Sequence, residues 1–135
     1  MSFQCFRQPT KKEKWDVCFT VFTNEFPGYG TYVYSDFIVS NNLQDVKAYE
    51  VSTDDFTFED FTKADIIEAD FNSTQRAIGS SWRFGGGPNI LPQINDAIFF
   101  VIQDAEGIFY KIKFLTLTND EGERGFPQFQ YVILQ

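Results

Sequence analysis

Three segments in the C-terminal third of the sequence are rich in apolar residues and separated by turns, and this feature limits the fold most. The segments are Ala97–Gln103, Ile108–Thr116 and Phe126–Leu134. Asp104 to Gly107 separates the first two, and a polar stretch with two glycines, 119–125, separates the last two. Because apolar side chains alternate along the middle segment and both connections are short, the sequence predicts three consecutive antiparallel strands, a meander. A helix anywhere across 108–116 would overturn this prediction.

Strand signals also occupy the N-terminal half. The predicted strands are Trp15–Thr23, Thr31–Val39 and Val46–Val51, with turn residues at 27–30 between the first two. Aromatic residues make up 19% of the 135 residues, which favours strands further. We therefore predict an all-β, mainly antiparallel domain over 14–135, preceded by an arm of residues 1–13.

At most one short helix is expected. It covers about Lys63 to Phe71, where Phe61, Ala64, Ile67 and Phe71 recur at helical spacing. The surrounding stretch, 50–70, carries eight carboxylates against Lys63 and is interpreted as a solvated acidic face.

Charge and missing residue types exclude several functions. A net charge of −8 argues against nucleic acid, which requires clustered Lys and Arg. The chain has no histidine, which removes Ser-His and Cys-His catalysis and most transition-metal sites. No carboxylate pair or nucleophile spacing replaces it, so we predict no catalytic site and no metal site. No window is long and apolar enough for a transmembrane helix, and the start at Met1 shows no secretory signal.

Smaller motifs favour structural interpretations. Cys5 and Cys18 are expected to be free thiols, with Cys18 buried in a strand. The glycines at 85–87 lack the Lys and the following helix of a phosphate loop, and Pro88 follows, so 80–92 is interpreted as a flexible loop. Residues 119–123 do not meet the pattern of a calcium loop and lie where a hairpin turn is required.

An ordered set of motifs resembles the HmuY-like family. Near the middle are Gly79-Ser80-Ser81-Trp82-Arg83-Phe84 and Gly87-Pro88, then the Phe-Phe-Val run within 95–101. The pattern Asp-x-x-Gly-x-x-x-Lys-x-x-Phe follows over 104–114, and the chain ends with Gly125-Phe126-Pro127-x-Phe129-x-Tyr131. The early segment Lys14-Trp15-Asp16-Val17-x-Phe19 fits as well. The resemblance covers 79–135 most firmly and 14–42 moderately.

The resemblance implies a β-sandwich or partly closed barrel and a location in the bacterial cell envelope or outside the cell. Family members look like haem-binding lipoproteins that take haem from host proteins and pass it to an outer-membrane receptor. It therefore implies a non-enzymatic protein in haem or porphyrin acquisition, with haem or another flat apolar ligand and a receptor or host protein as partners. The alternative is a cell-surface interaction protein on the same scaffold that no longer binds haem. Family members normally carry a signal, a lipidated cysteine and further strands before Trp15, whereas only 14 residues precede it here.

The family's ligand positions are occupied by other residue types. The resemblance places the two iron-binding histidines at Gly86 and near Asp54 or Asp55, and none of these can bind iron as imidazole does. We therefore predict no six-coordinate, low-spin haem held by two protein side chains, and at most micromolar affinity from apolar contact. The predicted ligand-binding residues are Trp82, Arg83, Phe84, Gly86, Phe56 and Phe58.

Overall fold

The computed structural model describes residues 3–5, 15–85 and 89–135. Its strands are β1 (Phe3–Cys5), β2 (Val17–Phe26), β3 (Gly30–Ser40), β4 (Lys47–Ser52), β5 (Arg83–Phe84), β6 (Gln93–Ile94), β7 (Ile98–Gln103), β8 (Phe109–Thr118) and β9 (Arg124–Ile133). Three short 3-10 helices complete the regular structure: η1 (Asn42–Gln44), η2 (Lys63–Asp65) and η3 (Glu68–Asp70). The described residues contain no α-helix, and the predicted all-β class is confirmed.

The predicted meander is confirmed. Strands β7, β8 and β9 pair antiparallel in sequence order, and β4 pairs with β7 to give the sheet order β4-β7-β8-β9. Asp104 fixes the first turn, because its side chain accepts the backbone N–H groups of Glu106 and Ile108 at 3.0 and 2.9 Å. Asn119 fixes the second turn in the same way, through the N–H groups of Glu121 and Glu123. Both side chains thus stabilise the turns in which they lie, as expected for Asp and Asn residues in hairpin loops.

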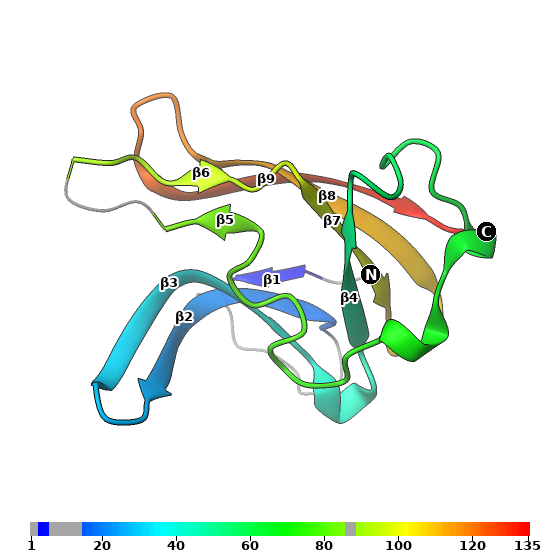
Figure 1. Ribbon diagram of the computed structural model, residues 1–135, viewed down its shortest axis with the longest axis horizontal. Helices are drawn as coiled ribbons and strands as arrows, with labels where there is room; N and C mark the ends of the chain where they lie inside the picture. The colour runs from blue at the N-terminus through cyan, green and yellow to red at the C-terminus, as the bar shows by residue number, and fades with distance from the viewer. Residues whose placement is uncertain (1–2, 6–14, 86–88) are drawn as a thin grey trace.

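A long hairpin of β2 and β3 forms a second sheet, with β1 parallel to β2 at its edge. Figure 1 shows this hairpin extending away from the four-stranded sheet, with its tip at the lower left. The register shifts by one residue, because Thr20 faces Phe37 whereas Phe22 faces Tyr34. Asp36 takes up the extra residue with a φ of 51°, a left-handed conformation typical of a β-bulge. The bulge redirects the outer half of β3.

Strand β7, inside the four-stranded sheet, is buried on both faces, whereas the edge strand β9 is largely exposed. On one face, Phe100 and Ile102 of β7 join a core that contains Val17 and Ile38 of the hairpin. On the other face, Phe99 and Val101 of β7 pack against Phe58 and Phe61, which belong to the segment that follows β4. A sheet covered on both sides needs apolar residues at successive positions, which explains the unbroken Ile-Phe-Phe-Val-Ile run of β7.

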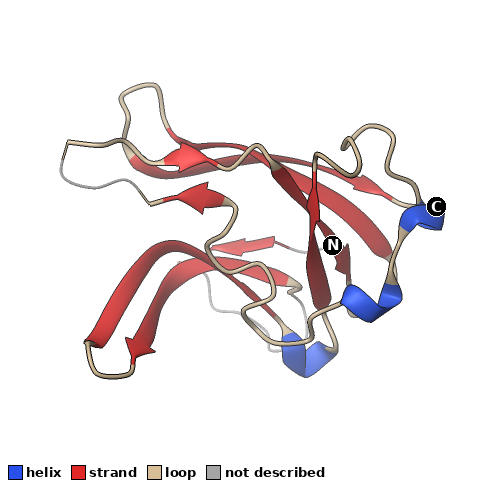
Figure 2. Ribbon diagram, viewed as in Figure 1, coloured by secondary structure: helices blue, strands red, loops and turns tan. Residues whose placement is uncertain are grey.

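The predicted helix over 63–71 is wrong. The segment forms the separate turns η2 and η3, and Ile66 between them is extended, with a ψ of 127°. Ile66 packs on the sheet, whereas Ile67, which the helical pattern placed inside, is 51% exposed. The phenol of Tyr49 also accepts the N–H of Ile67 at 3.2 Å. Contacts with the sheet therefore override the helical spacing, and Figure 2 shows the resulting turns on the side away from the hairpin tip.

Two smaller expectations also need correction. Cys18 is half-buried rather than buried, and its thiol lies 3.6 Å from the carbonyl oxygen of Phe19. The segment 80–92 is not wholly loop, because β5 pairs antiparallel with β6. The side chain of Cys5 and residues 86–88 lie outside what the structure describes. None of the described helices has the length or hydrophobicity needed to cross a membrane.

Gly79 is expected to be a sensitive position. It joins β3 through two hydrogen bonds with Ile38 and has a φ of +63°, where an added Cβ would lie 3.3 Å from the carbonyl oxygen of Arg76. Gly79→Ala should lower the free energy of unfolding by about 2 kcal/mol, from backbone strain and crowding. Gly28→Ala is the control, since its φ is +86° but nothing lies within 4 Å of the added Cβ. If urea unfolding gives equal losses of unfolding free energy for the two variants, crowding at Gly79 contributes nothing beyond backbone strain.

Candidate functional site

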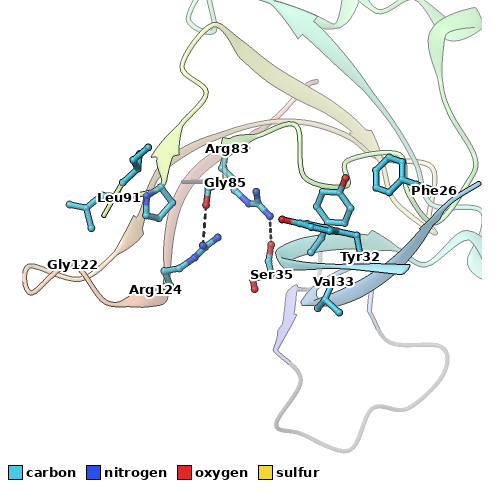
Figure 3. Close-up of a pocket in the computed structure, with 12 residues that line it drawn as sticks. Phe26, Tyr32, Val33, Ser35, Arg83, Gly85, Leu91, Gly122 and Arg124 are labelled. Carbon is cyan, nitrogen blue, oxygen red and sulfur yellow. Dashed lines mark hydrogen bonds between the residues drawn. The ribbon is translucent and has the colours of Figure 1, made fainter. Parts of the chain in front are cut away.

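A cavity of about 820 Å³ lies between the outer half of the hairpin, the β5–β6 connection and the turn before β9. Its walls combine three kinds of side chain: the aromatic Phe26, Tyr32 and Tyr34, the aliphatic Ile90, Leu91 and Pro92, and the cationic Arg83 and Arg124. Figure 3 shows Tyr32 and Phe26 on one side, Leu91 and Arg124 on the other, and Arg83 between them. The volume lies within the usual range for small-molecule sites.

Aromatic rings form a continuous row along one face of the hairpin, and its outer half lines the cavity. The centroid distances are 6.5 Å for Phe26–Tyr32, 5.5 Å for Tyr32–Tyr34, 6.3 Å for Tyr34–Phe37 and 4.4 Å for Phe37–Phe22. Residues two apart on a strand share a face, which accounts for Tyr32 and Tyr34. The bulge at Asp36 brings Phe37 onto the same face. The row gives the cavity a wall on which a flat ring can stack.

Arg83 supplies a buried positive charge. The residue is only 8% exposed, and its Nη2 donates to the carbonyl oxygen of Ser35. Its buried Nε has no hydrogen-bond acceptor among the described residues. Burial lowers the pKa of Arg83 from its usual value, and the nearby charge of Arg124 lowers it further. A guanidinium remains protonated under such shifts, so the cavity wall holds a charge that is incompletely neutralised.

Arg124 is held by protein groups. Its Nε donates to Asp36 Oδ2 at 2.7 Å, and its Nη1 donates to the carbonyl oxygen of Gly85 at 3.1 Å. Asp36 is the bulge residue, so the same local distortion places the aromatic row and the partner of Arg124. With one carboxylate between two guanidiniums, the polar part of the cavity favours an anionic group.

The structure separates the sequence-predicted ligand-binding residues. Arg83 lines the cavity, and Phe84 beside it is 58% exposed. Trp82 is 1% exposed in the core, where its indole N–H donates to the carbonyl oxygen of Asp36 at 3.0 Å. Phe58 is 5% exposed and packs edge-on against Phe99 on the far face of the sheet, with the 36% exposed Phe56 in the same segment. Gly86 lies outside the described residues.

Asp54 and Asp55, the other position matched to a family ligand, are exposed in the turn after β4. Neither lines the cavity beside Arg83. Their neighbour Thr53 lines a separate cavity of about 500 Å³ that includes Asp96 and Lys113. Among the described residues, no group of three or more His, Cys, Asp or Glu is placed to hold a metal ion.

Of the described residues that line the cavity, Arg83 alone was predicted from the sequence as a ligand contact. Those that were missed include Phe26, Tyr32, Tyr34 and Arg124. A signal for the tyrosines was present, because aromatic residues at alternate positions of a strand form a row on one face. No local signal connected them with Arg124, which lies 88 residues from its partner Asp36.

Comparisons with known proteins bear on the family and the fold. The family model described as HmuY protein matches residues 2–131. Among solved structures, the crystal structure of the apo HmuY analog of Tannerella forsythia is similar, with a TM-score of 0.52 and 18% identity, over 90% of this chain and 67% of that chain. At that identity the likeness concerns the fold alone. Curated proteins give no significant match. The resemblance expected from the sequence motifs is thus confirmed, and the chain belongs to the HmuY family.

Proposed function

We propose that this protein is a non-enzymatic binding protein of the cell envelope, and that its ligand is a flat apolar ring with carboxylate groups, of the haem or porphyrin class. The observation that carries the proposal is the buried Arg83, whose Nε has no acceptor among the described residues, in a cavity walled by aromatic rings. Membership of the HmuY family supports the ligand class and the location.

The residues of the cavity fit the two chemical parts of a porphyrin. The ring is flat and apolar and would stack on Tyr32 and Phe26, burying surface worth about 25 cal/mol per Å². The propionates are carboxylates, and a carboxylate near Arg83 would gain a charge-assisted hydrogen bond. Arg83 also offsets the net charge of −8, which on its own would repel an anionic ligand.

A protein partner remains the second candidate. Tyr29 at the hairpin tip is 93% exposed, and Leu91 at the rim of the cavity is 66% exposed. Exposed apolar side chains concentrated near one site are typical of surfaces that contact another protein. Under this alternative, the scaffold serves as an interaction protein and no porphyrin binds.

The test is a fluorescence titration with metal-free protoporphyrin. The wild-type protein should bind at micromolar concentration, and Arg83→Met, which keeps most of the side-chain volume, should bind about tenfold more weakly because a charged hydrogen bond is lost. Arg76→Met is the matched control: it removes the same charge from a side chain that lies over the Phe22 ring and does not line the cavity.

A second ligand tests whether Arg83 recognises the carboxylates of the porphyrin. With the dimethyl ester of the porphyrin, wild type and Arg83→Met should bind equally, because the carboxylates that Arg83 would recognise are blocked. Wild-type protein that shows no binding of either porphyrin would refute the proposal and favour the interaction protein. So would an Arg83→Met variant that binds the free acid as well as wild type does.

A further inference from the structure

Two phenols line the cavity, and they are the strongest iron donors that its described walls offer. Haem iron is held in proteins by imidazole, thiolate, thioether or phenolate groups. The described residues around the cavity include Tyr32 and Tyr34 but no histidine, cysteine or methionine. The phenols lie on the aromatic row, with ring centroids 5.5 Å apart.

Tyr34 is better placed than Tyr32 to act as a fixed donor. Tyr34 is half-buried, and its ring lies between those of Tyr32 and Phe37, at 5.5 and 6.3 Å. Tyr32 is 61% exposed, so its side chain is less restrained. A donor that is already ordered loses less conformational entropy when it binds.

The cation of Arg83 lines the same cavity as Tyr34. The guanidinium bonds to the carbonyl oxygen of Ser35, the residue that follows Tyr34. Tyr34 and Arg83 therefore approach the cavity from adjacent points of the same wall. The phenolate is the form of tyrosine that binds ferric iron.

We propose that Tyr34 is the protein donor to the iron of a ferric porphyrin bound in this cavity, whose wall also carries the guanidinium of Arg83; this inference rests on the proposed function. On binding, the phenol would release its proton to solvent, and the phenolate oxygen would donate an electron pair to the iron. No electron is transferred and the iron stays ferric. Tyr34 would then be the one protein donor to the iron, which favours a high-spin ferric state, because the chain has no histidine to supply a second donor.

The test compares ferric haem with metal-free protoporphyrin on the same variants. Wild type should bind ferric haem about tenfold more tightly than the metal-free ring, and its complex should give a high-spin electron paramagnetic resonance signal and phenolate bands in the resonance Raman spectrum. Tyr34→Phe removes one oxygen and keeps the ring of the row. It should lose the phenolate bands and the preference for iron, while its affinity for metal-free protoporphyrin stays within about twofold.

Tyr32→Phe is the matched control and should keep both the bands and the preference. Tyr34→His provides a gain of signal, since an imidazole at this position should replace the phenolate bands with those of histidine-bound iron. Phenolate bands that persist in Tyr34→Phe, or their absence from wild type, would overturn the assignment of Tyr34. If the assignment of Tyr34 fails in this way but wild type still binds the metal-free ring, the proposed function stands. If wild type binds neither ferric haem nor metal-free protoporphyrin, the assignment of Tyr34 and the proposed function are both overturned.

Discussion

Lys111→Met will lower the free energy of unfolding by about 3 kcal/mol or more, because three carbonyl groups, two in buried and one in a part-buried hydrogen bond, lose their donor. Lys111 is only 6% exposed, on the face of β8 that meets the segment after β4. Its ammonium donates to the carbonyl oxygens of Phe58, Glu59 and Phe61. Methionine preserves most of the packing of the stem and removes the ammonium, so the loss reports its hydrogen bonds together with its contact over the Phe58 ring, 4.9 Å from the centroid.

Lys113→Met is the matched control. Lys113 lies two residues along the same strand, and its Nζ contacts Glu59 Oε1 at 2.8 Å in a solvent-exposed ion pair. Exposed pairs contribute little to stability, so this variant should unfold close to wild type in urea. Equal destabilisation by the two substitutions would mean that stability depends on the charge of the lysines, and that the hydrogen bonds from Lys111 to the carbonyl groups contribute nothing further.

Lys111 also gives a physical reason for the pattern Asp-x-x-Gly-x-x-x-Lys-x-x-Phe. Asp104 closes the β7–β8 turn with two hydrogen bonds, and Gly107 has the positive φ of +81° that this turn needs. Lys111 anchors the segment on one face of the sheet, while Phe114 joins the core on the other. The pattern therefore combines a turn, an anchor and a core residue on one hairpin, and none of its members lines the cavity beside Arg83.

The longer strands, β2–β4 and β7–β9, could be predicted from the sequence because their signals are local, whereas the short β1, β5 and β6 were not predicted. Alternation in β8 and turn residues such as Asp104 act within a few positions, and the predicted ends lie within about three residues of those observed. The turns over 63–71 could not be predicted, since Ile66 and Tyr49 determine them through contacts with a sheet distant in sequence. The cavity depends on long-range geometry for the same reason. It requires the bulge at Asp36, and a single extra residue in a strand leaves no clear mark in the sequence.

Trp82 illustrates how an aromatic residue beside glycines can be interpreted in two ways. The sequence favoured it as a ligand contact, whereas the structure places it among Phe19, Phe114 and the rest of the core between the sheets. Its indole N–H bonds to the carbonyl oxygen of Asp36, so it supports the bulge from beneath. Trp82 thus contributes to the cavity by holding the backbone that carries Tyr34 and the partner of Arg124.

Trp82→Ala should therefore lower the free energy of unfolding by about 3–5 kcal/mol, the usual cost of removing a large aromatic side chain from a core. Trp82→Phe keeps a ring in place and removes the N–H, so its loss should be smaller, at about 1–3 kcal/mol from the unpaired carbonyl group and the lost volume. Both are measured by urea unfolding, with Trp15→Phe, at a half-buried position, as the control. A Trp82→Phe variant that unfolds like wild type but no longer binds protoporphyrin would contradict this account. Trp82 would then be a ligand contact, and its packing in the core would contribute little to the free energy of unfolding.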